Sequence, residues 1–67
     1  MDREFVSSSN LVSVGWENQT LEIEFKSGAV YVYHGVPEEL YQELMASPSK
    51  GSFFAANIKK TYQGIKQ

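Results

Sequence analysis

The sequence predicts an α+β domain in which a three-stranded antiparallel meander is followed by two helices packed on one face of the sheet. Two observations support this prediction. Apolar and polar residues alternate through much of residues 11–34, as in half-buried strands. From Pro37 onward, apolar residues recur at helical spacing. The 67 residues suffice for a single domain, and we expect residues 1–9 to form a loosely ordered N-terminal arm.

The first two strands are predicted from their alternation. The first begins near Leu11, carries apolar side chains at every second position up to Trp16, and contains Gly15 as a candidate bulge. A polar turn over residues 17–20 leads to the second strand, residues 21–26. This segment has the strictest alternation in the chain, with Leu, Ile and Phe on one face and two Glu and one Lys on the other. We therefore expect one face of the meander to be buried and the other to be polar.

The loop after the second strand decides which face the tyrosines of the third strand, residues 29–34, occupy. With a two-residue loop, Phe25 would pair with Val30, and the tyrosines would lie among the glutamates. With a three-residue loop, Gly28 would adopt a positive φ, Phe25 would pair with Ala29, and the tyrosines would join the apolar face. We favour the second register because it gathers the large apolar side chains on one face and needs positive φ only at glycine.

The two helices follow from a proline, a break and a stripe of apolar residues. Pro37 suits the start of a helix, and two glutamates follow it, where negative charge complements the helix dipole. This helix should end at the segment 47–49, which contains Pro48. A second helix is predicted from about Ser49 to about Gln63 because apolar residues recur there at four-residue spacing, with Gly64 beyond it as a stop. The apolar positions of the two helices are Leu40, Tyr41 and Leu44, then Phe54, Ile58 and Tyr62.

The composition argues against several classes of function. The chain has no Cys and one His, His34, so we expect no disulfide, no metal and no other cofactor. Glu22 and Glu24 share an open strand face, which offers no pocket to shift their pKa values for acid–base catalysis. Neither a nucleophile elbow nor a phosphate-binding glycine loop is present, so we predict that the protein is not an enzyme. Without a signal peptide or a membrane-spanning segment, we expect a cytoplasmic protein that does not bind membranes.

The charges are divided unevenly along the chain. All eight acidic residues precede Pro48, whereas four of the six basic residues follow it. A basic segment next to an aromatic side chain is what single-stranded RNA requires, namely counter-charges and a stacking plane. The same lysines could instead simply complete the solvated end of a helix. The candidate RNA-binding residues are Lys50, Phe53, Lys59, Lys60 and Lys66.

Two alternatives concern the strand residues. Tyr31 and Tyr33 are typical of a sheet that stacks RNA bases, but large aromatic side chains more commonly serve the core. Val30 and Val32 would lie on the opposite strand face and, with Phe53, could meet another protein or a second copy of the chain. A homodimer or protein-interaction module is therefore the alternative to an RNA-binding module.

An ordered set of short motifs resembles the KTSC domain, a module named for the C-terminus of some lysyl-tRNA synthetases and also found as small free-standing bacterial proteins. The resemblance extends from about Ser8 to Tyr62 and includes the family's Tyr-x-Tyr signature at Tyr31 and Tyr33. It implies a single small domain, and attachment to a synthetase suggests RNA as a partner. The motifs are Ser8-Ser9-Asn10-Leu11, Val14-Gly15-Trp16, Leu21 to Phe25, Gly28, Tyr31-Val32-Tyr33, Val36-Pro37, Tyr41, Leu44, Ser49 to Phe54 and Ile58-Lys59.

Overall fold

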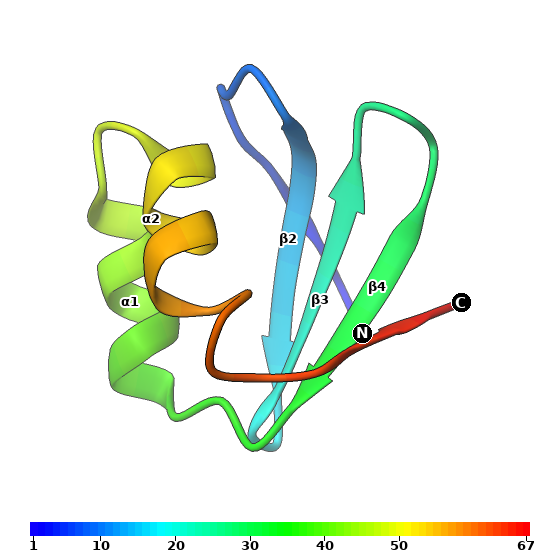
Figure 1. The fold of residues 1–67 in the computed structure, drawn as a ribbon, viewed down its shortest axis with the longest axis vertical. Coiled ribbons are helices and arrows are strands. Elements are labelled where there is room, and N and C mark those ends of the chain that lie inside the picture. Colours follow the sequence, from blue (N-terminus) through cyan, green and yellow to red (C-terminus); the bar gives the residue numbers. More distant parts are fainter.

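Two helices cover one face of a five-stranded antiparallel sheet in the computed structural model, which describes residues 1–67 (Figure 1). Neighbouring strands in the sheet follow one another in the chain, in the order β1-β2-β3-β4-β5. The α+β class is therefore confirmed. Neither helix has the length and apolar character needed to cross a membrane. The elements are β1 (Glu4–Phe5), β2 (Leu11–Glu17), β3 (Thr20–Phe25), β4 (Val30–His34), α1 (Glu38–Ala46), α2 (Lys50–Asn57) and β5 (Gly64–Lys66).

The prediction of three strands was wrong in number, because the meander β2-β3-β4 gains a short strand at each edge. β1 lies within the segment that we expected to be a loose arm, and it pairs with β2 so that Glu4 lies opposite Val14. β5 follows the helices and pairs with β4. These strands have two and three residues, which is too short for a period-two pattern to show in the sequence.

The register of the β3–β4 hairpin is the favoured one. Ile23 lies opposite Tyr31, and the N–H of Phe25 donates to the carbonyl oxygen of Ala29 at 2.8 Å. The loop has three residues and ends at Gly28, whose φ is 96°. Both tyrosines therefore face the helices, as we predicted. The bulge, however, lies between Leu11 and Ser13 instead of at Gly15.

The second helix is shorter than the sequence predicted. α2 ends at Asn57, and residues 58–62 form turns. The side-chain Nδ2 of Asn57 donates to the carbonyl oxygen of Phe53 at 3.1 Å, which competes with regular helical bonding. The N–H groups of Ile58 and Lys59 then both donate to the carbonyl oxygen of Phe54, at 2.9 and 3.0 Å, and this shared acceptor closes the helix. Gly64 consequently begins a strand and does not stop a helix.

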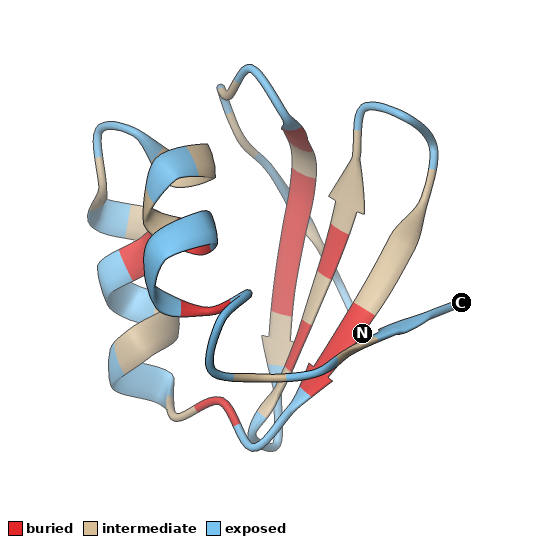
Figure 2. Cartoon of the chain, in the orientation of Figure 1, coloured by how far each residue is buried: buried red, intermediate tan, exposed pale blue.

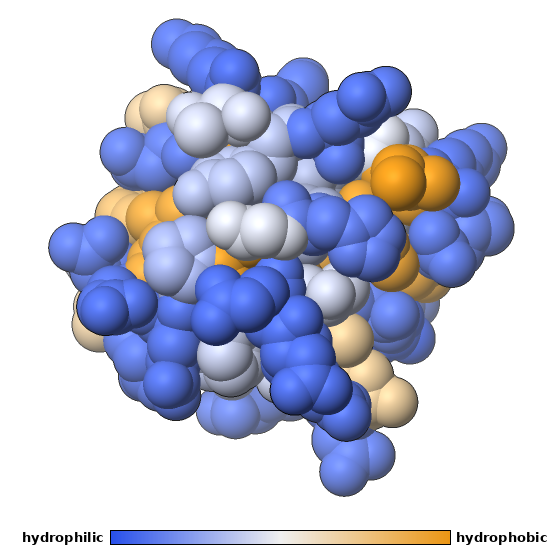
Figure 3. Space-filling model, turned by 90° about the horizontal axis from the view of Figure 1, so that it is seen from below, coloured by the Kyte–Doolittle hydropathy of each residue, from blue (hydrophilic) through white to orange (hydrophobic).

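The core fills the space between the sheet and the helices (Figure 2). Trp16 lies at its edge and stacks on Tyr41, with ring centroids 5.9 Å apart. Its indole N–H donates to the carbonyl oxygen of Val36 at 2.8 Å, which ties the start of α1 to β2. The face shown in Figure 3 is mostly hydrophilic, with hydrophobic residues in small patches. The buried core residues are Leu11, Val14, Leu21, Ile23, Tyr33, Val36, Leu44, Phe54 and Ile58.

Candidate nucleic-acid interface

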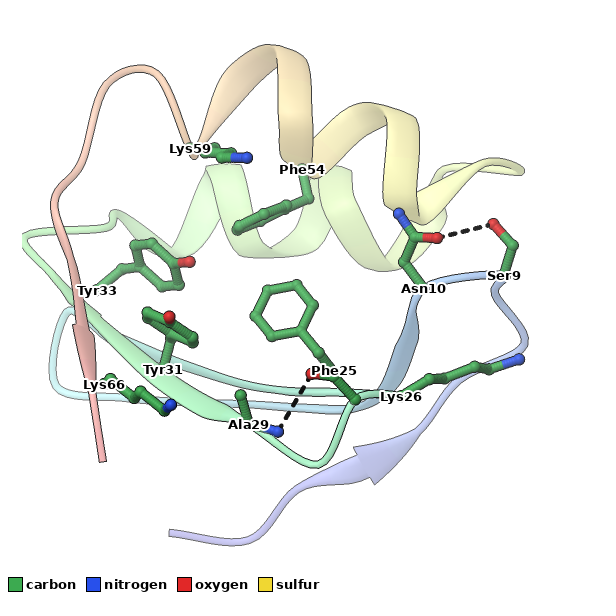
Figure 4. Close-up of a pocket in the computed structure, with 11 residues that line it drawn as sticks. Ser9, Asn10, Phe25, Lys26, Ala29, Tyr31, Tyr33, Phe54, Lys59 and Lys66 are labelled. Carbon is green, nitrogen blue, oxygen red and sulfur yellow. Dashed lines mark hydrogen bonds between the residues drawn. The ribbon is translucent and has the colours of Figure 1, made fainter.

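An open pocket of about 660 Å³ lies where the β3–β4 hairpin, α2 and β5 meet (Figure 4). Aromatic rings from the sheet and α2 form its floor, and lysines stand at its margins. No acidic side chain lines it. It therefore combines apolar surface with positive charge. The lining residues are Ser9, Asn10, Phe25, Lys26, Ser27, Ala29, Tyr31, Tyr33, Phe54, Lys59 and Lys66.

Four of these aromatic rings contact one another in a closed cycle. Tyr31 and Tyr33 are stacked, with centroids 6.5 Å apart and planes inclined by 26°. Phe54 meets Tyr33 edge-on at 5.4 Å and Phe25 at 5.5 Å, and Phe25 meets Tyr31 at 5.7 Å. Such edge-on and offset arrangements are the ones that aromatic pairs prefer. The cycle fixes the position of Tyr31, which is half-buried and borders the pocket.

β5 completes the pocket through two of its residues. Lys66 lies opposite Tyr31 in the ladder, so their side chains project from the same face of the sheet. Gly64 lies opposite Tyr33, whose ring occupies the space above it. A Cβ at residue 64 would lie 2.8 Å from Cε2 of Tyr33. Glycine here lets the aromatic ring and the last strand pack together.

Three lysines at the pocket have no carboxylate partner. Lys26, Lys59 and Lys66 are all exposed, and the two salt bridges of the protein both belong to Arg3, which contacts Glu22 at 2.7 Å. The ammonium groups are therefore available to an anion from outside the chain. Because all three lysines line one pocket that no acidic side chain lines, the pocket favours an anionic ligand.

Burial raises the pKa of the Tyr33 phenol, and the neighbouring Tyr31 raises it further. The phenol is thus protonated at neutral pH and can donate a hydrogen bond. The pocket contributes neutral hydroxyls in addition to its ammonium groups.

The structure separates the residues that the sequence analysis grouped together. Lys59 and Lys66 line the same pocket. Lys50 lies at a second, polar hollow beside the start of α2, and its Nζ donates to the carbonyl oxygen of Ser47 at 3.0 Å. Lys60 is exposed and lines no pocket. Phe53 is half-buried and packs against the core, whereas Lys60 lies beyond the end of α2 and is exposed.

The sequence analysis missed Lys26, Phe25 and Phe54 as members of a site. Lys26 stands in the hairpin loop, where it looks like an ordinary polar loop residue. Phe54 is a buried core residue and Phe25 packs against the core, so the apolar pattern of the sequence indicates a structural role for both. The favoured hairpin register was a usable signal, because it places Tyr31 on the same face of the sheet as Phe25.

The described residues contain no cluster of three or more His, Cys, Asp or Glu side chains that could hold a metal ion. The groups that the pocket offers to a ligand are aromatic rings, hydroxyls and ammonium groups.

Comparison with known proteins identifies the family. The model of the KTSC domain matches residues 7–62, so the chain belongs to the KTSC domain family. It is similar to the crystal structure of a KTSC domain protein from Yersinia pestis, with a TM-score of 0.94, 41% identity, and coverage of 98% of this chain and 96% of the other. The resemblance noted from the motifs is confirmed.

Two curated relatives show where such domains occur. An uncharacterized protein of Stutzerimonas stutzeri is 46% identical over 56 residues, which are 81% of this chain and 79% of the relative. A lysine–tRNA ligase of Nostoc punctiforme is 45% identical over 47 residues, which are 70% of this chain and 8% of the ligase. The chain thus corresponds to a small region of that ligase, and the family match itself names no reaction.

Proposed function

We propose that this protein is a small binding module that holds a short segment of single-stranded RNA in the pocket between the hairpin, α2 and β5. The observation that carries the proposal is the group of three unpaired lysines, Lys26, Lys59 and Lys66, around an aromatic pocket that no acidic residue lines. Single-stranded nucleic acids are bound by this combination, because bases stack on rings while ammonium groups neutralise phosphates.

The overall charge limits the length of the bound segment. The protein has a net charge of −2, and α1 exposes Glu38, Glu39 and Glu43. Like charge on that side repels a long polyanion. We therefore propose contact with about three phosphates, one for each pocket lysine.

The relationship to lysine–tRNA ligases supports RNA as the polyanion. The name of the Nostoc punctiforme relative includes tRNA, and the matching region is 45% identical to this chain. Transfer of an RNA-related role from that region to this chain forms part of the proposal.

The direct test is a titration with a mixed-sequence single-stranded RNA at two salt concentrations, in which binding is measured by fluorescence anisotropy. Three phosphate contacts predict a loss of about 2 log units of affinity per log unit of salt. Lys59→Ala should weaken binding several-fold and reduce the salt dependence by about 0.7 log units. The matched control is Lys60→Ala, which removes the same charge from a neighbouring exposed residue that lines no pocket. Equal losses from both variants, or no binding by the unmodified protein, would overturn the proposal.

A second candidate function is self-association through the edge strand β1. Phe5 is 80% exposed there, the most exposed of the large hydrophobic side chains, and β1 has one free edge. Two copies could pair their β1 edges about a twofold axis and cover both Phe5 rings. The Val30 and Val32 face is less accessible than the sequence suggested, because Val32 is only 9% exposed.

If two copies pair through β1, a mass measurement should give a dimer that Phe5→Glu converts to a monomer. A monomeric unmodified protein would exclude this candidate.

A further inference from the structure

The pocket contains two hydrogen-bonding groups that no protein atom uses. The hydroxyls of Tyr31 and Tyr33 make no hydrogen bond within the chain, although Tyr33 is only 4% exposed. No fully buried side-chain nitrogen or oxygen lacks a partner, so both hydroxyl oxygens keep some exposed surface, and both tyrosines line the pocket. Figure 4 shows both hydroxyl oxygens between Lys59 and Lys66 in that view. A ligand in the pocket would meet two free phenols beside the ammonium groups.

The two serine hydroxyls of the pocket are already engaged. The hydroxyl of Ser9 donates to Oδ1 of Asn10 at 3.3 Å, and the hydroxyl of Ser27 accepts from the N–H of Ala29 at 3.4 Å. The lysines donate but cannot accept. Tyr31 and Tyr33 therefore provide the two unengaged hydroxyls of the pocket, and each of them can both donate and accept.

We infer that the hydroxyls of Tyr31 and Tyr33 select ribose over deoxyribose by hydrogen bonding to the 2′-hydroxyl of the bound nucleotide. This inference rests on the proposed function. Phosphates and bases are common to RNA and DNA, so the lysines and the rings alone cannot distinguish them. The 2′-hydroxyl belongs to RNA alone and, like a phenol, both donates and accepts. The raised pKa of Tyr33 keeps its donor proton in place throughout the neutral range.

The experiment compares three single-stranded probes of one mixed sequence: RNA, DNA, and RNA with 2′-O-methyl groups. Each is titrated against the unmodified protein and against the double variant Tyr31→Phe, Tyr33→Phe, which keeps both rings and removes both hydroxyls. We expect the unmodified protein to bind RNA about tenfold more tightly than DNA, as one or two net hydrogen bonds allow. The 2′-O-methyl probe should bind with an affinity between those of RNA and DNA, because its ether oxygen still accepts a hydrogen bond but no longer carries a donor proton. Tyr41→Phe is the matched control, since this tyrosine stacks on Trp16 and does not line the pocket.

The double variant decides the matter, because its ratio of RNA to DNA affinity should fall to about one. Thermal unfolding confirms that it is folded, and we expect it to fold because neither hydroxyl bonds to the protein. Equal affinities of the unmodified protein for RNA and DNA would overturn this inference while leaving RNA binding intact. A preference for RNA that persists in the double variant would overturn it as well. Failure to bind any probe would remove the proposed function and this inference together.

Discussion

At the residue scale, individual contacts decide how this small protein holds its elements together. Gly15 is the simplest example of such a contact, because a Cβ there would lie 2.7 Å from the carbonyl oxygen of Asp2. The absence of a side chain lets the N-terminal segment lie against β2, where Arg3 reaches Glu22. The composition made Gly15 a candidate bulge, but its role depends on a neighbour 13 residues earlier in the chain. Such a contact leaves no local pattern in the sequence.

Trp16→Phe should destabilise the protein by about 1–3 kcal/mol. The substitution removes the indole N–H and leaves the carbonyl oxygen of Val36, a fully buried residue, without its hydrogen bond. Urea unfolding monitored by circular dichroism measures the change in the free energy of unfolding. Tryptophan fluorescence cannot be used, because the variant lacks the only tryptophan of the chain. Tyr62→Phe is the control, because the hydroxyl of this half-buried tyrosine makes no hydrogen bond in the protein. An unchanged unfolding midpoint for Trp16→Phe would contradict this account.

The stability of the protein should fall as the pH rises above about 10. An unfolded tyrosine has a pKa of about 10. Burial raises the pKa of Tyr33 in the folded state, so the unfolded state releases its proton first. The contribution of Tyr33 to the free energy of unfolding is therefore fully present below the pKa of the unfolded state. It is lost as the pH rises through the pKa of the folded state. Urea midpoints between pH 8 and pH 11 should decline, and Tyr33→Phe should make the decline shallower. Tyr41, whose pKa burial also raises, accounts for part of the remaining decline. An identical decline in the variant would show that Tyr33 has no part in it.

At the scale of elements, the sequence predicted what local patterns encode and missed what depends on distant partners. The register of β3 and β4 followed from Gly28 and from alternation within each strand. β5 could not be predicted, because three residues become a strand only when the edge of β4 is available to pair with them. The end of α2 was misplaced because the spacing of Phe54, Ile58 and Tyr62 continues beyond the helix. Ile58 is fully buried all the same, from a turn that keeps it over the core.

Gly64→Ala tests the packing of β5. The new Cβ would lie 2.8 Å from Cε2 of Tyr33, whose ring contacts Tyr31 and Phe54 and has little room to move. We expect a loss of about 1–3 kcal/mol in the free energy of unfolding. Faster amide hydrogen exchange in β4 should accompany it as β5 detaches.

The matched control is the same substitution at Gly51 in the first turn of α2. There the nearest atom, Oγ of Ser8, lies at an ordinary 3.5 Å. Alanine is the better helix former by up to about 1 kcal/mol, so Gly51→Ala should be neutral or stabilising. If both substitutions had the same effect, the close contact between Gly64 and Tyr33 would not be what limits residue 64.

At the scale of the whole molecule, the fold brings together charged and aromatic residues that lie far apart in the chain, from Phe25 to Lys66. The unequal distribution of charge was visible in the sequence, and two of the four C-terminal lysines, Lys59 and Lys66, line the pocket. The pocket nevertheless takes Lys26 from a hairpin loop and Lys66 from an unpredicted strand, while Lys50 and Lys60 lie elsewhere. Sequence distance could not show this grouping, because it depends on how β5 returns to the edge of β4.

The most direct test of the central claim is to map the RNA contact on the isotopically labelled protein by NMR. Addition of single-stranded RNA should shift the backbone amides of the hairpin loop, of Tyr31 and Tyr33, and of residues 59–66. The chemical shifts of the amides of α1, which carries three exposed glutamates, should not change. Shifts confined to α1, to β1 or to the surroundings of Lys50, or no shifts at all, would contradict the claim that this pocket binds RNA.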